Sequence, residues 1–483
     1  MAKYIENNEQ KIKKIEGIIL GKRVIEYIKQ ETKGEGEKVM REVINLVNDL
    51  LWGKNILVVM LIGAAIYLSI KTNFMQFRLF GDIVKILGKR EENGEGVSSL
   101  EAFFLGTACR VGAGNITGVV AAIAVGGPGA IFWMWLVALL GAATSFIEST
   151  LAVMYREKVG NKEYRGGTPW IIEKRLNKRW LGIIYAIASL ICYVGVIQVM
   201  SNSVTQSINN AYGYGVKEIA IVLAIIVGVI VFFRGKKDTI IVALNKIVPV
   251  MAILYLVLVA YVVVTNLTAI PSMLETIVKQ AFGIKEVAGG GIGIVIMQGV
   301  RRGLFSNEAG SGDSNYAAAV VDIDEPAKQG MVQALGVFVD TLIVCSATAF
   351  IILLADPEVV EAGKKIGEMA MFQEAIKSHI GWIGIPFTIV VLLFFSLSTI
   401  LAVTFYGKNA INFIMESKEM RYLYHIVVVL MVYVGGIEQN LFVWSLADFG
   451  LGIMTVINII CILPIAKEAI EELKKYELKL KKK

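Results

Sequence analysis

The sequence predicts an all-α integral membrane protein with about 11 transmembrane helices, built as an inverted 5+5 repeat with two broken helices plus one extra N-terminal helix. The 483-residue chain is 55% hydrophobic with a mean hydropathy of +0.63, above the roughly 45–50% apolar content of soluble chains. The apolar residues form nearly uncharged blocks, several close to the roughly 20 residues that span a bilayer. Two of the blocks carry glycine-rich interruptions, five helices apart.

The hydropathy blocks place the helices in order. They are expected at 55–71, 100–123, 129–155, 180–209, 218–233, 243–265, 271–303, 329–354, 382–405, 422–437 and 441–464. The second is interrupted at 112–115. The seventh is interrupted at 289–291, between pieces at 271–282 and 292–303, and Arg301 and Arg302 are expected to end it.

Three regions follow from this pattern: a polar amphipathic extension at 1–50, a transmembrane domain at 51–466, and a basic tail at 467–483. Isoleucine and valine recur at helical spacing in the extension, which fits a helix on the membrane surface or a solvated helix. The extension lacks the short apolar stretch of a cleavable signal peptide.

Loop charges predict the orientation, because lysine and arginine stay on the cytoplasmic side of short loops. The loops at 72–99, 156–179, 234–237 and 408–421 and the tail carry basic clusters, whereas 126–128, 210–212 and 435–438 are poor in them. We therefore expect a multi-pass protein of the cell membrane with a cytoplasmic C-terminus. An odd helix count then puts the N-terminus outside.

The sequence lacks the motifs that mark several classes of enzyme and metal-binding protein. The four cysteines lie in or beside apolar blocks without metal-ligand spacing, and the two histidines are far apart in the chain. The sequence contains no zinc-protease motif, phosphate-binding loop or nucleophile elbow. We expect no enzyme activity and no nucleic-acid partner, and we expect a monomer in the lipid bilayer.

Glycine breaks inside membrane helices have a chemical meaning. An unwound backbone is tolerated in a membrane only where it faces protein or a watery cavity. It leaves free N–H groups that suit a carboxylate and free carbonyls that suit a cation, as in transporters with inverted repeats. A single glycine-rich spot can also serve close helix packing. Two breaks at equivalent places favour a binding site.

Five strings carry a family resemblance. They are TACRVGAGNITGV at 107–119, GGPGAIFWMW at 126–135, GGTPWIIEK at 166–174, GVRRGLFSNEAG at 299–310 and VDTLIVC at 339–345. In this order they resemble motifs of the alanine/glycine:cation symporters. The resemblance covers about residues 50–464 and implies a leucine-transporter-like fold and symport of a small neutral amino acid with Na⁺ or, alternatively, H⁺, by alternating access.

The resemblance also implies site residues. Substrate contacts are expected from the first break, from the fourth and ninth helices, and from the second break. These residues are Gly112, Ala113, Gly114, Asn115, Gln198, Met200, Asn202, Gly290, Gly291 and Val403. A sodium site is expected at Val111, Asn115, Ser398 and Thr399, since Na⁺ favours oxygen ligands.

Three departures from the family pattern concern the substrate. The family usually has threonine at Ala113, glutamine at Met200 and tryptophan at Val403. Losing a bulky aromatic at Val403 would enlarge the pocket, so we expect a substrate larger or more apolar than alanine. A difference of one methylene group in a hydrophobic pocket changes selectivity by only about 1–3 kcal/mol, and the loss of a tryptophan removes more of the pocket wall than that.

Ionisable residues within predicted spans are rare and usually functional. Glu148, Asp340 and Asp448 lie in such positions, and one could carry a coupling proton, or each could be paired with arginine or backbone. Arg110, beside the first break, is either a gate partner or a counter-ion for one of these acids. An amino-acid-gated channel and a non-transporting membrane sensor remain as alternative functions.

Overall fold

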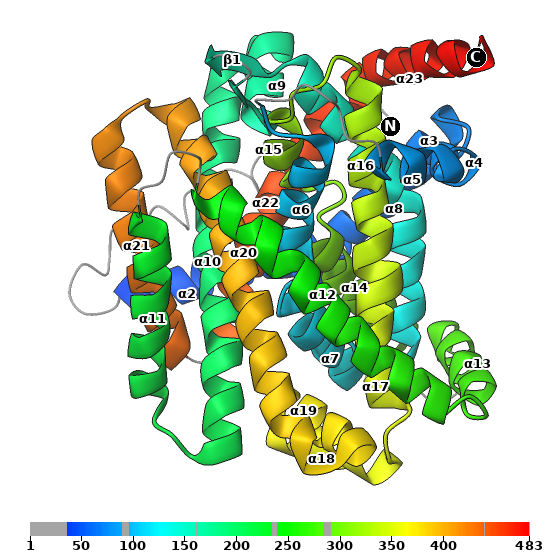
Figure 1. Ribbon diagram of the computed structural model, residues 1–483, viewed down its shortest axis with the longest axis vertical. Helices are drawn as coiled ribbons and strands as arrows, with labels where there is room; N and C mark the ends of the chain where they lie inside the picture. Colours follow the sequence, from blue (N-terminus) through cyan, green and yellow to red (C-terminus); the bar gives the residue numbers. More distant parts are fainter. Residues whose placement is uncertain are drawn as a thin grey trace, which may run out of the picture.

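The computed structural model describes residues 36–88, 96–160, 163–233, 239–283, 291–438 and 440–482. Nearly all of them are helical, and the long helices run between the two ends of the molecule in Figure 1. The first repeat consists of α6 Ser99–Arg110, α7 Gly114–Gly126, α8 Gly129–Met154, α10 Arg179–Tyr212, α11 Val216–Phe232 and α12 Thr239–Thr265.

The second repeat follows in the same order. It consists of α14 Gly291–Asn307, α15 Ser314–Ala319, the continuous segment α16 Pro326–Val337, η2 Phe338–Cys345 and α17 Ser346–Leu353, then α20 Gly384–Ile414, α21 Lys418–Ile437 and α22 Asn440–Ile462. In each repeat a broken helix leads four others. The predicted fold class is confirmed.

The remaining elements flank the repeats. Before them come α2 Gly36–Asn48, the π-helix η1 Asp49–Gly53, α3 Ile56–Lys71, α4 Met75–Arg78 and α5 Phe80–Gly88. Within the first repeat lie β1 Glu157–Gly160, β2 Glu163–Arg165 and α9 Thr168–Leu176, and within the second lie α18 Pro357–Ile366, α19 Glu368–Ile380 and η3 Gly381–Ile383. Between the repeats lies α13 Ile270–Ala281, and after them come η4 Leu463–Ile465 and α23 Ala466–Lys481.

These flanking elements gather at the two ends. Figure 1 shows β1, α9, α4, α5 and α23 at one end, and α13, α18 and α19 at the other. The loops that were predicted to be basic therefore lie, in their described parts, at the same end of the molecule. At that end Arg165 on β2 bonds Glu416 after α20 at 2.7 Å, and this hydrogen bond lowers the pKa of the Glu416 carboxyl.

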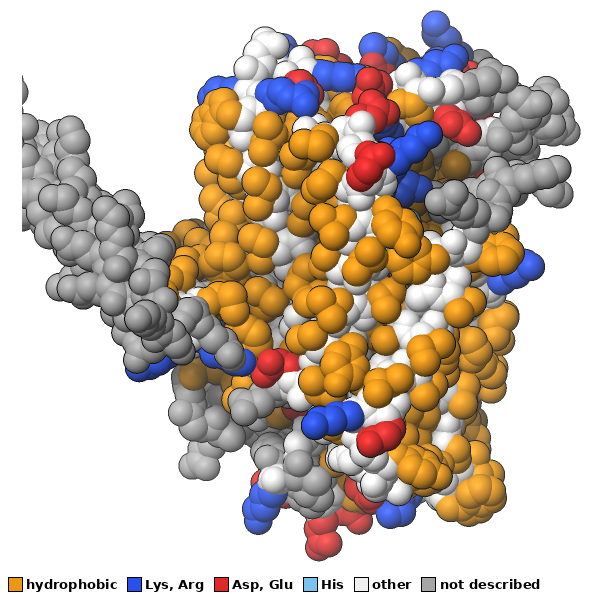
Figure 2. Space-filling model, turned by 90° about the vertical axis from the view of Figure 1, so that its left-hand side faces the viewer, with side chains coloured by type: hydrophobic (Ala, Val, Ile, Leu, Met, Phe, Trp, Pro, Cys, Tyr) orange, Lys and Arg blue, Asp and Glu red, His pale blue; other side chains and the backbone are white. Residues whose placement is uncertain are grey.

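The outer surface fits a bilayer. Figure 2 shows one face with a broad band of hydrophobic side chains and with charged side chains mostly toward its two ends. On α11 the side chains of Ile225 and Val229 are exposed, as is Leu430 on α21. In the described part of the chain, 8 helices are long and apolar enough to cross a membrane, or 9 if the bent pair Lys38–Gly53 and Ile56–Lys71 is one span. The total of eleven stays a prediction.

Three expectations about the seventh helix are wrong. The helix α13 is a separate element, and α14 begins at Gly291 and runs unbroken to Asn307. The interruption lies at 308–313, where Glu308, Gly310 and Gly312 have φ values of 59°, 101° and 84° that a right-handed helix cannot continue. Arg301 and Arg302 lie inside α14 instead of ending it.

Small residues let α10 and α22 pack backbone to backbone. A Cβ on Gly195 would lie 2.4 Å from the Ala447 nitrogen, and one on Gly450 would lie 2.4 Å from the Cys192 nitrogen. These glycines fix the distance between the two helices. They thereby fix the positions of the side chains that α10 presents to the centre of the protein.

Replacing Gly450 with alanine is expected to lower the midpoint of thermal unfolding in detergent by several degrees. The new methyl group would overlap backbone atoms that cannot move aside, and such overpacking costs about 1–3 kcal/mol. Gly228→Ala is the matched control, because a Cβ there meets Val429 at an ordinary 3.6 Å. Equal midpoints for the two variants would contradict this description of the interface.

Candidate functional site

The first break separates α6 from α7. A capping box at Ser98 and Glu101 starts α6, which ends at Arg110. The next three residues leave the helix, and α7 starts at Gly114. Gly112 is required there because a Cβ would lie 1.9 Å from Thr399 Oγ1 on α20. The two elements meet too closely for any larger residue.

The second break faces the first. Gly312 is enclosed by Thr168, Tyr185 and Asn458, each less than 3 Å from a Cβ built there. Two tyrosines on α10 hold the chain in place by hydrogen bonds within the break and at its end. Tyr185 Oη donates to the Ser311 carbonyl at 2.7 Å, and Tyr193 Oη donates to Asp313 Oδ1 at 2.7 Å.

A cavity, called here the central cavity, lies where the breaks meet α10, α20 and α22. Its lining residues are Cys109, Arg110, Gly112, Gly114, Cys192, Tyr193, Val196, Met200, Phe305, Glu308, Asp313, Thr399, Val403 and Leu451. The open space measures about 30 Å³, which is room for about two water molecules. An amino acid needs more room, so this conformation is a closed one.

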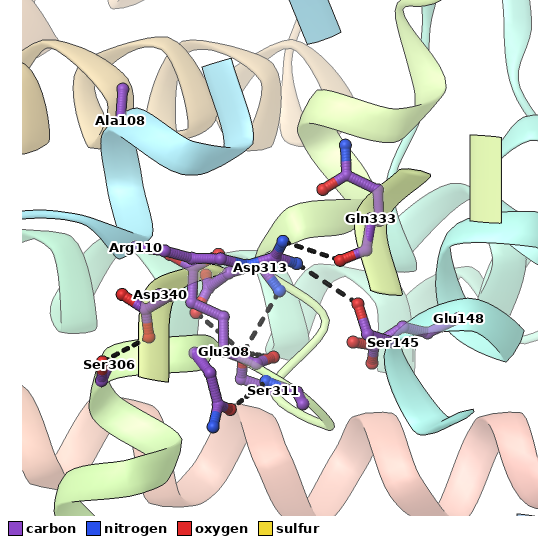
Figure 3. A network of polar contacts seen from close by, with 12 residues as sticks. Ala108, Arg110, Ser145, Glu148, Ser306, Glu308, Ser311, Asp313, Gln333 and Asp340 are labelled. Carbon is purple, nitrogen blue, oxygen red and sulfur yellow. Dashed lines mark hydrogen bonds and ion pairs between the residues drawn. The ribbon is translucent and has the colours of Figure 1, made fainter. Parts of the chain in front are cut away.

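Arg110 is the charged centre of the site (Figure 3). Its Nη1 donates to the Gln333 carbonyl at 2.9 Å, its Nη2 donates to Ser145 Oγ at 3.2 Å, and its Nε lies 3.8 Å from Glu308 Oε2. Gly336 makes room for it, because a Cβ there would lie 2.1 Å from Nη1. Arg110 is thus a counter-ion for Glu308, and not for Glu148, Asp340 or Asp448, the three acids among which its partner was expected.

Asp340 forms a second polar cluster with the two broken helices. Its carboxylate, in the π-helical segment η2, accepts hydrogen bonds from Asn115 Nδ2 and Ser306 Oγ, and from Thr341 Oγ1 at 2.9 Å. Asn115 Oδ1 in turn accepts from the Gly112 amide at 3.0 Å. Within the described ranges no basic side chain lies at ion-pair distance from Asp340. Asn115 therefore links this carboxylate to the wall of the central cavity.

The electrostatic balance of the site is negative. Glu148, Glu308, Asp313 and Asp340 are all buried, and of these Glu308 lies at ion-pair distance from the Arg110 guanidinium. Buried charges are costly unless they are paired. One guanidinium cannot neutralise four carboxylates, so the remaining carboxyl groups need protons or bound cations.

Two of the predicted charges are already paired. Glu148 Oε1 accepts from the Gly310 amide at 3.2 Å, and its Oε2 accepts from Asn458 Nδ2 at 2.7 Å. Asp448 pairs with Arg301 and lies 3.6 Å from Arg302 Nη1. Both acids fit the alternative that they are satisfied by arginine or backbone.

Several predicted site residues do come together. Gly112, Gly114, Met200, Thr399 and Val403 line the central cavity. The buried residues Val111 and Ala113 belong to the break itself. Asn115 points toward Asp340 instead of the cavity.

Other predicted residues lie elsewhere. Gln198 Nε2 contacts Met431 Sδ on α21 at 3.2 Å, because Gly435 packs directly on its backbone. Ser398 Oγ donates to the Phe395 carbonyl at 2.9 Å and contacts Met251 on α12, so it faces away from Thr399, its neighbour on the helix.

Asn202 and the predicted second-break glycines are also displaced from the central cavity. Asn202 lies beside a different cavity, between α7, α10 and α19. Gly291 is exposed at the start of α14, a full helix away from the actual break, and Gly290 lies outside the described residues.

Sequence reasoning missed Ser306, Glu308, Asp313 and Tyr193. The first three belong to the segment Ser306–Asp313 in which two acids alternate with glycine and serine inside an apolar stretch. That composition was a signal for the second break. Tyr193 gave no comparable signal, because nothing in its local sequence separates it from other buried aromatic residues.

Comparison with known proteins decides the family. The model of the sodium:alanine symporter family matches residues 37–483. The chain belongs to this family. It is 42% identical over 442 residues to the amino-acid carrier protein AlsT of Bacillus subtilis, covering 91% of this chain and 93% of AlsT. It is 38% identical to the probable sodium/glutamine symporter GlnT of Bacillus subtilis, covering 91% of each chain.

An archaeal relative and two solved structures complete the comparison. The sodium/alanine symporter AgcS of Methanococcus maripaludis is 32% identical, over 90% of this chain and 96% of AgcS. A Na⁺-coupled sialic acid symporter in a substrate-bound outward-open state has a TM-score of 0.51 at 12% identity, over 84% and 86% of the two chains. MhsT in complex with L-phenylalanine has a TM-score of 0.50 at 14% identity, over 78% and 89%.

These comparisons confirm a leucine-transporter-like fold and a transporter family. Family membership supports sodium-coupled amino-acid symport by a multi-pass membrane protein and confirms that the chain is no enzyme. The solved structures, at this low identity, bear on the fold alone.

Proposed function

We propose that this symporter carries a neutral amino acid larger than alanine together with Na⁺ by alternating access, with the substrate in the central cavity. The observation that carries this proposal is the excess of buried carboxyl groups at the junction of two broken helices, where four such groups are buried and Arg110 pairs with one of them, Glu308. Such a site needs protons or bound cations to be stable. We assign bound Na⁺, the ion in the family's name, to this role.

Asp340 is the ligand we assign to the coupling ion. Na⁺ is a hard cation that prefers oxygen, and the Asp340 carboxylate lies within hydrogen-bond distance of the Ser306 and Thr341 hydroxyls. These oxygens come from α14 and η2, on either side of the second break. The Thr399 hydroxyl at the cavity donates to the Ala108 carbonyl at 3.3 Å, so its oxygen lone pairs are what it can offer an ion, whereas Ser398 is turned toward α12.

Coupling between ion and substrate would pass through Asn115. Its amide nitrogen bonds Asp340, and its oxygen accepts from the Gly112 amide in the cavity wall. An ion bound at Asp340 would fix Asn115 and hence the backbone of the first break. Differential binding of this kind is what shifts a conformational equilibrium.

The lining of the central cavity supports a substrate larger than alanine. Met200, Val403 and Leu451 form part of an apolar wall, and Val403 occupies the position where the family usually has tryptophan. The relative GlnT, named as a probable sodium/glutamine symporter, is consistent with larger substrates in this family. The closed cavity must open by helix movement to admit them.

The orientation is also part of the proposal, with the C-terminus in the cytoplasm and the N-terminal region outside. Arg41 on α2 lies 3.2 Å from Glu438, which joins α21 to α22 in a loop poor in basic residues. The basic loops gather at the opposite end of these helices (Figure 1). That distribution follows the positive-inside rule.

The test of this proposal is uptake of labelled amino acids into proteoliposomes that contain the purified protein. With an inward Na⁺ gradient we expect accumulation of a larger neutral amino acid, such as glutamine, leucine or methionine. Uptake driven equally well by a proton gradient without Na⁺ would contradict the sodium assignment. Preference for alanine and glycine with exclusion of leucine and methionine would contradict the substrate size.

Replacing Val403 with tryptophan is expected to shift selectivity toward small substrates. The indole would fill space in the cavity wall, and pocket differences of this kind change selectivity by about 10–200-fold. The ratio of kcat/KM for the preferred large substrate to that for alanine should fall by at least about tenfold. Val403→Ile, which keeps a β-branched side chain, is the control, and an unchanged ratio in the tryptophan variant would contradict the role of Val403.

A further inference from the structure

A groove, called here the outer groove, lies on the apolar surface of the protein between α8, α12, η2 and α17. Its open space measures about 520 Å³, within the range of about 300–1,000 Å³ that is typical of ligand pockets. One wall belongs to the second half of α12, which contributes Leu256, Val259 and Val263, and Figure 1 shows this half of the helix beside α17. The exposed side chain of Ile343 also lines the groove, which is therefore open toward the outside.

The lining of the outer groove is apolar. Among its described residues none carries a charge, and Ser346 carries the one hydroxyl group. That hydroxyl already accepts a hydrogen bond from Trp135 Nε1, another residue of the lining, at 2.7 Å. A ligand with a charged or strongly polar group would lose its water here without gaining a partner, which costs free energy. The groove therefore fits a hydrocarbon chain.

The surroundings of the groove identify the source of that chain. Val257 and Val264 on the same half of α12 are exposed, and exposed apolar surface of this kind marks contact with a membrane. This half of α12 leads to α13, at the end of the molecule that faces outside in the orientation proposed above. The hydrocarbon that reaches the groove is then an acyl chain of a phospholipid in the outer leaflet.

Three hydrogen bonds connect the wall of the groove to the proposed ion ligand. The first joins Trp135 to Ser346, as described above. In the second, Ser346 Oγ donates to the Thr341 carbonyl at 3.4 Å, and in the third, Thr341 Oγ1 donates to the Asp340 carboxylate at 2.9 Å. The groove and the ligand lie on opposite faces of one segment, since Asp340 is 0% exposed whereas Ile343 is 47% exposed.

That segment, η2, is a π-helix, a rare geometry that is frequently found at functional sites. Relaxation to an α-helix would remove one residue from the turn and rotate one side of η2 by about 100° relative to the other. Asp340 would then no longer face both Ser306 and Asn115. Because Leu342 and Ile343 border the groove on the outside of η2, a chain that fills the groove packs against η2 and opposes this change.

We propose that the outer groove binds one acyl chain of an outer-leaflet phospholipid, and that the bound chain raises the affinity of the Asp340 site for Na⁺. This inference rests on the proposed sodium symport. The chain holds η2 in its π-helical form. Trp135 and Ser346 are positioning residues, which act on Asp340 through Thr341. Because such coupling is reciprocal, Na⁺ raises the affinity for the lipid by the same factor.

The first experiment measures occupancy of the groove by tryptophan fluorescence. Full-length protein in detergent is titrated with a phosphatidylglycerol that carries bromine atoms on one acyl chain, because bromine quenches the fluorescence of a tryptophan that it contacts. We expect quenching that saturates as lipid is added, and the saturable part should be absent in Trp135→Phe. Quenching that rises only in proportion to the lipid in the micelles, equally in both proteins, would overturn the binding site.

The second experiment measures the coupling with labelled Na⁺. In delipidated wild-type protein, added dioleoyl phosphatidylglycerol should lower the half-saturating Na⁺ concentration by at least about fivefold. Trp135→Phe keeps the groove apolar but removes the N–H donor, so this factor should fall toward one. Trp133→Phe is the matched control, because Trp133 on the same helix donates to the Ala281 carbonyl, and neither residue lines the groove. The control should keep the full effect of the lipid.

The outcomes separate this inference from the symport itself. If wild-type protein binds Na⁺ with the same affinity with and without the lipid, the coupling is wrong and the symport stands. Equal responses of Trp135→Phe and Trp133→Phe to the lipid would overturn the route through Ser346. A wild type that binds no Na⁺ in either condition would contradict the symport and with it the coupling, whereas saturable quenching of Trp135 would still show the bound chain.

Discussion

Replacing Asp340 with asparagine is expected to abolish sodium-dependent uptake. The asparagine keeps the size of the side chain and removes the charge that we assign to the ion. Even residues that only support a metal ligand change affinity by about 10–100-fold, so losing the ligand itself should cost at least about 100-fold in Na⁺ affinity. The measurement is Na⁺-dependent thermal stabilisation of the purified protein, together with uptake into proteoliposomes.

Glu148→Gln is the control for Asp340. Glu148 is as deeply buried, but it accepts hydrogen bonds from the Gly310 amide and Asn458 instead of facing both breaks. We expect this variant to keep its sodium dependence. If Glu148→Gln lost its sodium dependence while Asp340→Asn retained it, the assignment of Asp340 as the ion ligand would be contradicted.

Replacing Arg110 with methionine is expected to destabilise the folded protein strongly. The methionine fills similar space but leaves Glu308 and the neighbouring carboxyl groups without their guanidinium. Breaking a buried ion pair by removing one partner typically costs about 3–5 kcal/mol. The midpoint of thermal unfolding in detergent should fall by many degrees, and the protein should lose its single symmetric peak in size-exclusion chromatography.

Two further variants separate this effect from the general loss of an arginine. Arg165→Met breaks two pairs at the end of the molecule, with the partly exposed acids Glu157 and Glu416, and such pairs contribute no more than about 1 kcal/mol each. In the double variant Arg110→Met, Glu308→Gln, removal of the unpaired carboxylate should recover part of the lost stability. Equal unfolding midpoints for Arg110→Met and Arg165→Met would contradict the central role of Arg110.

Much of the fold could be predicted because membrane helices are constrained by length and apolarity. The first break was found from its glycines, although it lies at 111–113 and not at 112–115, since Gly114 and Asn115 already belong to α7. The arrangement of two repeats followed from the spacing of the breaks. The second break was placed wrongly, at 289–291, because a run of glycines was taken as the strongest signal. The actual break depends on positive φ values at Glu308, Gly310 and Gly312 in a motif that mixes glycine with acids.

The site was predictable where residues belong to the first break and less so where helices meet. Met200 and Val403 were found through their departures from the family pattern. Gln198 and Ser398 were misplaced because the face that a residue presents depends on which neighbour packs against its helix. Gly435 on α21 and Met251 on α12 decide these two cases, and neither contact can be read from local sequence.

The acids at Glu308 and Asp313 illustrate a further limit. Sequence shows that charged residues lie in an apolar stretch, but it does not show which of them share a counter-ion. The pairing of Arg110 on α6 with Glu308 arises only where α6 and the second break come together (Figure 3). The other buried carboxyl groups need protons or bound cations, and our proposal assigns Na⁺ to this role.

The most direct test is binding of labelled amino acid to the purified wild-type protein, titrated with Na⁺ at constant ionic strength and constant pH. We expect saturable binding of a neutral amino acid larger than alanine. Na⁺ should raise the affinity for the amino acid, and the amino acid should raise the affinity for Na⁺ by the same factor, as linkage requires. Amino-acid binding that is independent of Na⁺, or absent for every neutral amino acid, would contradict sodium-coupled symport through this site.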